Sequence, residues 1–245
     1  MTIIDCRKRH YRDINAQVDN IWNEGVRDIR LDGVNGQRYI GRALSGEGMI
    51  EIVGVPGDDL GMFMDGATLR VHGNAQDGVG NTMNSGKIIV EGDIRDIAGY
   101  AMRGGKIWVR GNAGYRVGIH MKSYLNDYPV IIVGGTSHDF LGEYMAGGLI
   151  MVLGLGLKSD YSPVGKFIAS GMHGGKMFIR GKFIPEQAGP GIGIDKPTPE
   201  DYIEILSYIT EYANDLGIDL LDIRSEDFVK VYPTTTRPYG QVYAY

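Results

Sequence analysis

Few side chains in this sequence have the types and spacing that catalysis or metal binding requires. Five histidines are present, and those at His72, His120, His138 and His173 occupy different positions relative to the surrounding glycines. The ligands of one metal ion must converge on a point, so these histidines do not predict a metal site. Cys6 is the only cysteine, which excludes a thiolate cage for zinc or for an iron–sulfur cluster built from this chain alone.

Two other patterns resemble parts of catalytic motifs. Asp58 and Asp59 are adjacent acids in the turn PGDDLG, and pairs of acids act as acid and base in polysaccharide-cleaving enzymes. Two acids in one turn, with no partner on a neighbouring segment, are more simply interpreted as a solvated corner. Lys87 and Lys106 each follow a glycine, but the first glycine and the Ser/Thr of a phosphate loop are missing. We therefore expect these lysines to be solvated.

The elements that would position such residues repeat along the chain. Seven segments alternate apolar residues in the manner of a half-buried strand, as in RGGKIWVRG, and each ends on a closing glycine. Successive closing glycines are 19 residues apart, except for one spacing of 24 and one of 27. A unit this short cannot bury its apolar face alone, so stacked coils of a parallel β-helix are predicted. The closing glycines are Gly54, Gly73, Gly92, Gly111, Gly135, Gly154 and Gly181.

A second glycine follows most closing glycines by seven residues, and a methionine follows three residues later. In the sixth copy we align Gly165 and Ile168 with this pair. A glycine at the same corner of every coil permits positive φ and keeps the corner free of side-chain collisions. The second glycines are Gly61, Gly80, Gly99, Gly118 and Gly142.

The repeats divide the chain into three parts. Residues 1–43 form an N-terminal cap with a helix over residues 11–24 followed by a strand, and residues 44–182 form the β-helix of about 19-residue repeats. Residues 183–245 form an extension, in which one helix runs from Pro199 to about Leu216 and an aromatic-rich tail has strand character. The apolar side of that helix is expected to consist of Tyr202, Ile205, Leu206, Ile209 and Tyr212 or Ala213.

An apolar stripe is predicted on the outer face of the coils. The outward residue between each inward pair is charged in the first two copies, at Glu51 and Arg70, and apolar in the next five. A stripe of that size must be covered, either by the C-terminal extension or by another subunit. The stripe is our candidate docking face for a partner. It consists of Ile89, Trp108, Ile132, Met151 and Phe178.

Composition narrows the classes of partner. The chain has 245 residues, 43% of them apolar, and a net charge of −5 without a basic run. Nucleic acid and anionic membranes call for a basic surface, so neither is expected as a partner. The charged start and the absence of a long apolar run give neither a signal peptide nor a membrane span, and a cytoplasmic location is expected.

The repeated glycine pattern resembles a known family. Glycine, two residues, glycine and then Ile-x-Val-x-Gly is similar to the GXGXG domain at the C-terminal end of the glutamate synthase large subunit. GQRYIG at Gly36 to Gly41 and the turn VPGDDLGMFMDG strengthen the resemblance, which covers residues 30–182. A similar domain forms one of the subunits of formylmethanofuran dehydrogenase.

The resemblance implies a mainly β fold, a single-stranded right-handed parallel β-helix of about seven coils that separates catalytic domains. In glutamate synthase these are a glutamine amidotransferase with an N-terminal cysteine nucleophile and an FMN/iron–sulfur synthase that makes glutamate from 2-oxoglutarate and ammonia. Here Thr2 follows Met1, and Cys6 lies four residues further on. No catalytic or cofactor-binding residue is therefore assigned to this chain, and FMN and the iron–sulfur cluster are expected on partner subunits.

The resemblance thus implies a stand-alone, non-catalytic scaffold subunit of a divided glutamate synthase, which docks an amidotransferase subunit and a synthase subunit. A component of formylmethanofuran dehydrogenase, or of another amidotransferase-linked oxidoreductase, is the alternative. An independent β-helix enzyme acting on polysaccharide is the second alternative. Self-association of the isolated chain also remains open.

Overall fold

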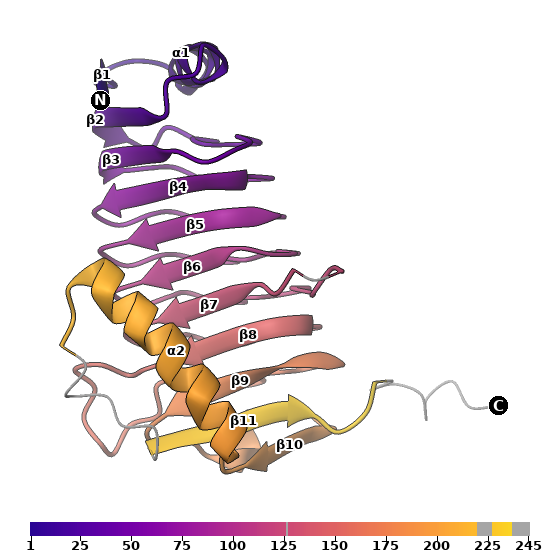
Figure 1. Cartoon of the computed structure of the whole chain (residues 1–245). Coiled ribbons are helices and arrows are strands. Elements are labelled where there is room, and N and C mark those ends of the chain that lie inside the picture. Colours follow the sequence, from indigo (N-terminus) through magenta and orange to yellow (C-terminus); the bar gives the residue numbers. More distant parts are fainter. Residues whose placement is uncertain (126, 220–226, 237–245) are drawn as a thin grey trace.

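The computed structural model describes residues 1–125, 127–219 and 227–236. Its coils stack into a tall solenoid, and one sheet runs along the whole stack in the order β1-β2-β3-β4-β5-β6-β7-β8-β9-β11-β10 (Figure 1). The strands are β1 Thr2–Asp5, β2 Asp28–Asn35, β3 Met49–Val55, β4 Asp65–His72, β5 Ser85–Val90, β6 Lys106–Val109, β7 Val130–Val133, β8 Ala146–Val152, β9 Gly174–Arg180, β10 Ile192–Asp195 and β11 Phe228–Pro233. The helices are α1 Tyr11–Asn23, α2 Pro199–Leu216 and the short 3₁₀ helix η1 Pro185–Gln187.

Each repeat contributes one strand to the parallel part of the sheet. Strands β3 to β9 come from the seven predicted copies, and six turns of the right-handed solenoid join them (Figure 1). The register brings equivalent residues together, so that Leu69 pairs with Ile50 on one side and with Ile88 on the other. These alternate residues are fully buried between the two walls of each coil. The predicted mainly β, parallel β-helix is confirmed.

The first coil is capped by α1 and β1. Ile14, Val18 and Trp22 recur on one face of α1 and are buried against the solenoid, and the Trp22 Nε1 donates to the carbonyl of Ser45 at 2.9 Å. Strand β2 lies where the sequence predicts a strand, parallel to β3. Strand β1, which has no counterpart among the predicted elements, pairs with β2 and covers its outer edge. The apolar coil interior is thereby closed at this end.

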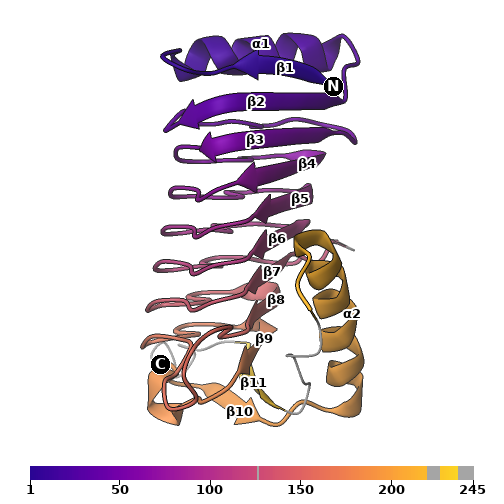
Figure 2. The same cartoon turned by 90° about the vertical axis from the view of Figure 1, so that its left-hand side faces the viewer.

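The other end is closed by a change of strand direction. Strand β11 pairs antiparallel with β9, and β10 pairs antiparallel with β11. Helix α2 lies between β10 and β11 in sequence and runs along the outer face of the sheet (Figure 1). In Figure 2 the helix lies on one side of the stack and the loops that leave the strands extend to the other side.

The return wall of each coil depends on the second glycine column. Gly118 has φ +71°, and a Cβ there would lie 2.4 Å from Ile150 Cδ1 inside the core. The predicted reason for this column is confirmed at the five glycines, since all have positive φ and a Cβ on each would lie 2.4–2.8 Å from a side-chain atom of the core. The alignment of the sixth copy is wrong. Ala169 (φ +57°) occupies the glycine position, and the buried Met172 occupies the methionine position three residues later. The alignment missed this pair because alanine here replaces the glycine on which the pattern was based.

Candidate functional site

Helix α2 covers the outer apolar stripe. Trp108, Ile132, Met151 and Phe178 are 0% exposed and Ile89 is 1% exposed. These side chains form one buried cluster with the apolar side of the helix, to which α2 contributes Ile205, Ile209, Tyr212 and Leu216. The stripe is therefore internal packing, and its interpretation as a docking face for a partner is wrong. The sequence alone could not decide this, since the covering helix lies outside the repeats.

Lysines of the sheet fix α2 at its polar edge. Lys87 Nζ lies 2.7 Å from both Glu211 Oε1 and Asp215 Oδ2, and Lys106 Nζ lies 2.6 Å from Glu211 Oε2. The hydrogen bonds to these carboxylates outweigh the effect of burial and raise the pKa of Lys87. The expectation that Lys87 and Lys106 are solvated is therefore wrong. Both are half-buried, and both bind the helix that covers the stripe.

Further hydrogen bonds orient the same helix. Trp108 Nε1 donates to Asp215 Oδ2 at 2.9 Å, and the Tyr212 hydroxyl donates to the carbonyl of Val109 at 2.9 Å. Arg70 donates to the carbonyl of Asp215 at 2.9 Å. A buried indole N–H and a buried hydroxyl need such partners, so α2 binds in one register and position.

Some closing glycines are required by close approach and others by their backbone conformation. Gly92 and Gly111 do not have positive φ, but a Cβ on Gly92 would lie 2.1 Å from Asn74 Oδ1 and one on Gly111 would lie 2.2 Å from Asp93 Oδ1. Positive φ, the predicted reason for glycine, therefore does not apply at these two positions. They need glycine because a side chain of the preceding coil passes directly over them.

That side chain belongs to a ladder that was not predicted from the sequence. The side-chain Oδ1 of the residue after a closing glycine accepts a hydrogen bond from the backbone N–H of the equivalent residue in the next coil. Asn74 accepts from Asp93 at 2.8 Å, Asp93 accepts from Asn112 at 2.7 Å, and Asn112 accepts from Thr136 at 2.9 Å. The recurrence of Asn or Asp directly after the glycine was the signal that could have revealed it. The ladder satisfies backbone donors at a corner where the sheet has ended.

The side chains that could carry chemistry lie apart from one another. Asp58 pairs with Arg38 at 3.4 Å, whereas Asp59 accepts from Asn81 Nδ2 at 2.8 Å. Burial raises the pKa of Cys6 to about 11, so its thiol is protonated at neutral pH. Within the described ranges no three His, Cys, Asp or Glu side chains are grouped as metal ligands would be.

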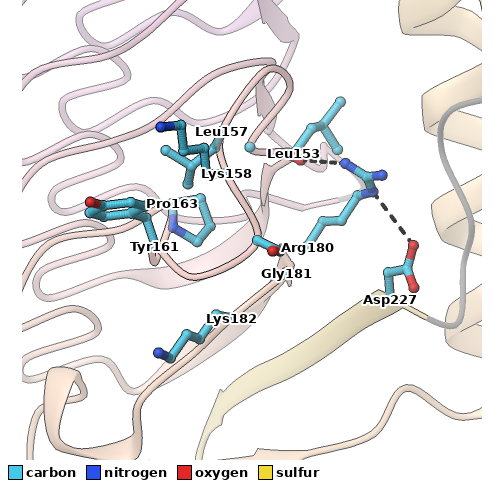
Figure 3. Close-up of a pocket in the computed structure, with 11 residues that line it drawn as sticks. Leu153, Leu157, Lys158, Tyr161, Pro163, Arg180, Gly181, Lys182 and Asp227 are labelled. Atoms are coloured by element: carbon cyan, nitrogen blue, oxygen red, sulfur yellow. Dashed lines mark hydrogen bonds and ion pairs between the residues drawn. The ribbon is translucent and has the colours of Figure 1, made fainter.

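A pocket of about 420 Å³ lies where the longest repeat leaves β8 and where β9 ends (Figure 3). Arg180 donates to the carbonyl of Leu153 at 3.2 Å and faces Asp227 at 3.8 Å, whereas Lys158 and Lys182 lie on the other side of the pocket (Figure 3). Lys182 donates to the carbonyl of Asp160 at 3.2 Å. Arg180 and Lys182 bind different protein groups, and Lys158 and Lys182 lie across the pocket from Arg180, so this geometry does not form a site for one anion.

Comparison with known proteins is decisive at the level of the family. The family model described as GXGXG motif matches residues 7–234, which includes α1, the repeats and the elements that close the other end. The chain belongs to the GXGXG motif family. The resemblance to the glutamate synthase C-terminal domain is thereby confirmed, and it extends beyond residues 30–182 on both sides. The similarity to formylmethanofuran dehydrogenase stays a prediction.

This GXGXG protein also has a relative over its full length. It is 47% identical, over 249 residues, to an uncharacterised protein of Methanocaldococcus jannaschii, and the match covers 98% of this chain and 95% of the relative. The relative thus contains almost nothing beyond the region that the two proteins share. Among the described residues of the GXGXG chain, no helix is both long and apolar enough to cross a membrane.

Proposed function

We propose that this chain is a non-catalytic scaffold subunit of a divided, cytoplasmic glutamate synthase. It holds a glutamine amidotransferase subunit and an FMN/iron–sulfur synthase subunit in one assembly, so that ammonia released from glutamine reaches 2-oxoglutarate. The observation that carries this proposal is the family match over residues 7–234. The proposal assigns the catalysis and the cofactors to the partner subunits.

The build of the chain supports such a role. A stack of coils in register, closed at both ends and fixed by α2 along its outer face, is a stiff body with a large lateral surface. Its buried polar groups stabilise the packing of α2 and the corners of the coils. The uncharacterised relative has nearly the same extent as this chain, as expected for a separate subunit of a divided enzyme.

Reconstitution tests the proposal. The amidotransferase and synthase chains encoded in the same genome are purified separately, and glutamine-dependent and ammonia-dependent glutamate formation is measured with and without this chain. We expect the three chains to elute together, and we expect the glutamine-dependent rate to rise at least tenfold while the ammonia-dependent rate is unchanged. A scaffold affects the transfer between subunits and leaves the chemistry of the synthase as it is.

Two results would contradict the proposal. One is elution of this chain apart from both catalytic chains, with equal rates in its presence and absence. The other is stoichiometric assembly with the subunits of a molybdenum or tungsten dehydrogenase, which would identify the protein as the component of a formylmethanofuran-type enzyme. Hydrolysis of a polysaccharide by the chain alone would instead favour the β-helix enzyme.

A further inference from the structure

The return wall of the last coils carries exposed aromatic side chains. We name as the aromatic wall Tyr100, Tyr115, His120, Phe140, Tyr144 and Phe167. Phe167 is 53% exposed, Tyr115 43%, Tyr100 39% and Tyr144 37%. This wall belongs to the segments that return between strands, on the side of the stack opposite α2 (Figure 2).

The aromatic wall consists of two groups of rings in mutual contact and of Tyr115, which stacks on His138 with ring centroids 4.8 Å apart. His120 stacks on Tyr144 with ring centroids 5.3 Å apart and meets the edge of Tyr100 at 6.0 Å. Phe140 stacks on Phe167 at 5.3 Å. Arg116 joins the two groups, because its guanidinium lies over the Phe140 ring at 4.4 Å and its Nε lies 3.0 Å from Glu143 Oε2, next to Tyr144.

Backbone conformation makes several of these side chains costly. His120, Phe140, Tyr144 and Phe167 all have φ between +53° and +63°, a region that bulky side chains rarely adopt and that glycine or asparagine fills at less cost. Equivalent positions in other coils hold small residues such as Gly78, Thr82 and Ala101, but also the large residues Tyr39, Phe63 and Ile97. The later coils differ in that aromatic side chains occupy these positions in neighbouring coils and gather on one surface, which favours an interaction there.

Charges at the border indicate what covers the aromatic wall. Arg103, Lys122 and Lys166 lie next to it in sequence and are exposed, and none of them forms an ion pair within the part of the chain that the structure describes. Of the nearby carboxylates, Glu143 is paired with Arg116, whereas Asp96 and Asp139 each accept a backbone N–H of the next coil and keep their negative charge. The border therefore carries three cations that have no ion-pair partner among the described residues, although the chain as a whole carries −5.

We propose that the aromatic wall is the docking surface for a catalytic subunit, on a complementary patch with an apolar centre and carboxylates at its rim. This inference rests on the proposed scaffold function and locates its interface. The wall lies opposite α2, so docking there leaves the packing of the helix untouched. Aromatic side chains at the centre with cations around them are the usual composition of such interfaces.

Asparagine substitutions separate docking from stability. The double variant Tyr144→Asn/Phe167→Asn is titrated against the purified amidotransferase and synthase chains, and its unfolding temperature is measured. Asparagine suits positive φ, so the variant is expected to be at least as stable as the unaltered protein. Its dissociation constant for one catalytic chain is expected to rise at least tenfold.

The matched control is Phe63→Asn. Phe63 is 45% exposed with φ +57° at the position equivalent to Tyr144, but it lies in an early coil outside the aromatic wall. It should change binding less than twofold. The double variant Lys122→Glu/Lys166→Glu should weaken the binding of the unaltered protein's partner, because it reverses two charges at the border of the wall. It should also make the dissociation constant less dependent on salt.

The outcomes separate the two proposals. Unchanged binding of both catalytic chains by Tyr144→Asn/Phe167→Asn would overturn the docking surface and leave the scaffold function standing. A lower unfolding temperature with unchanged binding would show that the stacks serve stability. Failure of the unaltered protein to bind either chain overturns both proposals. Self-association that the double variant abolishes would make a second copy the occupant and overturn the proposed one.

Discussion

Gly118 shows how little space the interior leaves at the second glycine column. Its φ of +71° suits glycine, and a Cβ would lie 2.4 Å from Ile150 Cδ1 in the next coil. Both effects act on the same residue, because its backbone conformation disfavours a side chain and a Cβ would also displace Ile150 in a closely packed core.

We expect Gly118→Ala to lower the free energy of unfolding by about 2–4 kcal/mol, because strain at positive φ adds to overpacking of the core. Urea unfolding measures the change. The control is Gly156→Ala, since Gly156 has φ +76° and no atom within 4 Å of the place that a Cβ would take. The control should lose only about 1 kcal/mol, the cost of the backbone conformation alone. Equal losses in both variants would show that crowding is unimportant at Gly118.

At the scale of elements, α2 is held to the sheet by its apolar side. Ile209 is 1% exposed in the cluster with Trp108, whereas Ile203 on the same helix is 70% exposed. Substitutions at these two positions can therefore distinguish residues that pack against the sheet from residues that face solvent.

Ile209→Ala should destabilise the protein by about 2–4 kcal/mol, as expected when a buried branched side chain leaves a cavity. Ile203→Ala removes the same atoms from an exposed position and should change stability by less than about 0.5 kcal/mol. Thermal and urea unfolding of the two variants provide the comparison. Similar small losses for both would mean that α2 contributes little to the stability of the solenoid.

Asp201, in the first turn of α2, makes the stability of the protein depend on pH in the acid range. Burial would raise the pKa of Asp201, but hydrogen bonds from Lys230, from the backbone N–H of Thr198 and from Lys176 outweigh it and lower the pKa to about 2. The unfolded carboxyl, near 3.8, takes up its proton first as the pH falls. The stability that Asp201 contributes is therefore complete above about pH 4 and is lost as the pH approaches 2.

Asp201→Asn should lower stability at neutral pH by about 1–3 kcal/mol, since two lysines lose their charged partner. The variant should also show a flatter dependence of unfolding free energy on pH between about 4 and 2. Chemical denaturation at a series of pH values tests this expectation. A variant whose pH profile runs parallel to that of the unaltered protein would exclude Asp201 as the source of the acid sensitivity.

Elements with a strong local period were predictable, and their tertiary partners were not. Alternation identified the strands, and the helical spacing of Ile205 and Ile209 identified α2 and the side that it buries. Leu206 was expected on that side and is 51% exposed, because the buried stripe of the helix is narrower than the apolar one. The lysines of the repeats could not be assigned to α2, since ion pairs across more than 100 residues leave no trace in spacing. Strand β1 has only four residues, too few for a period to show.

For the whole molecule, the C-terminal part is a cover as well as an end. Strand β11 occupies the edge of β9, and α2 occupies the outer apolar stripe. Removing residues 183–245 would expose an unpaired strand edge and a large apolar face together.

We expect that truncated protein to self-associate at micromolar concentrations, where the full-length chain does not aggregate. Light scattering after gel filtration is the measurement. Addition of a peptide of residues 196–218 should reduce the association by covering the stripe again. A truncated chain that stays monomeric and folded would show that the coils need neither cover.

The regular stacking fixes the height that each coil adds to the solenoid. Neighbouring coils are joined strand to strand, at about 4.8 Å per coil, and equivalent residues recur at each level. Inserting or deleting one repeat would therefore lengthen or shorten the body by one fixed step, with little change in its cross-section. A family built this way can alter the separation of whatever it holds only in whole steps, so gain or loss of repeats is its natural means of adjusting reach.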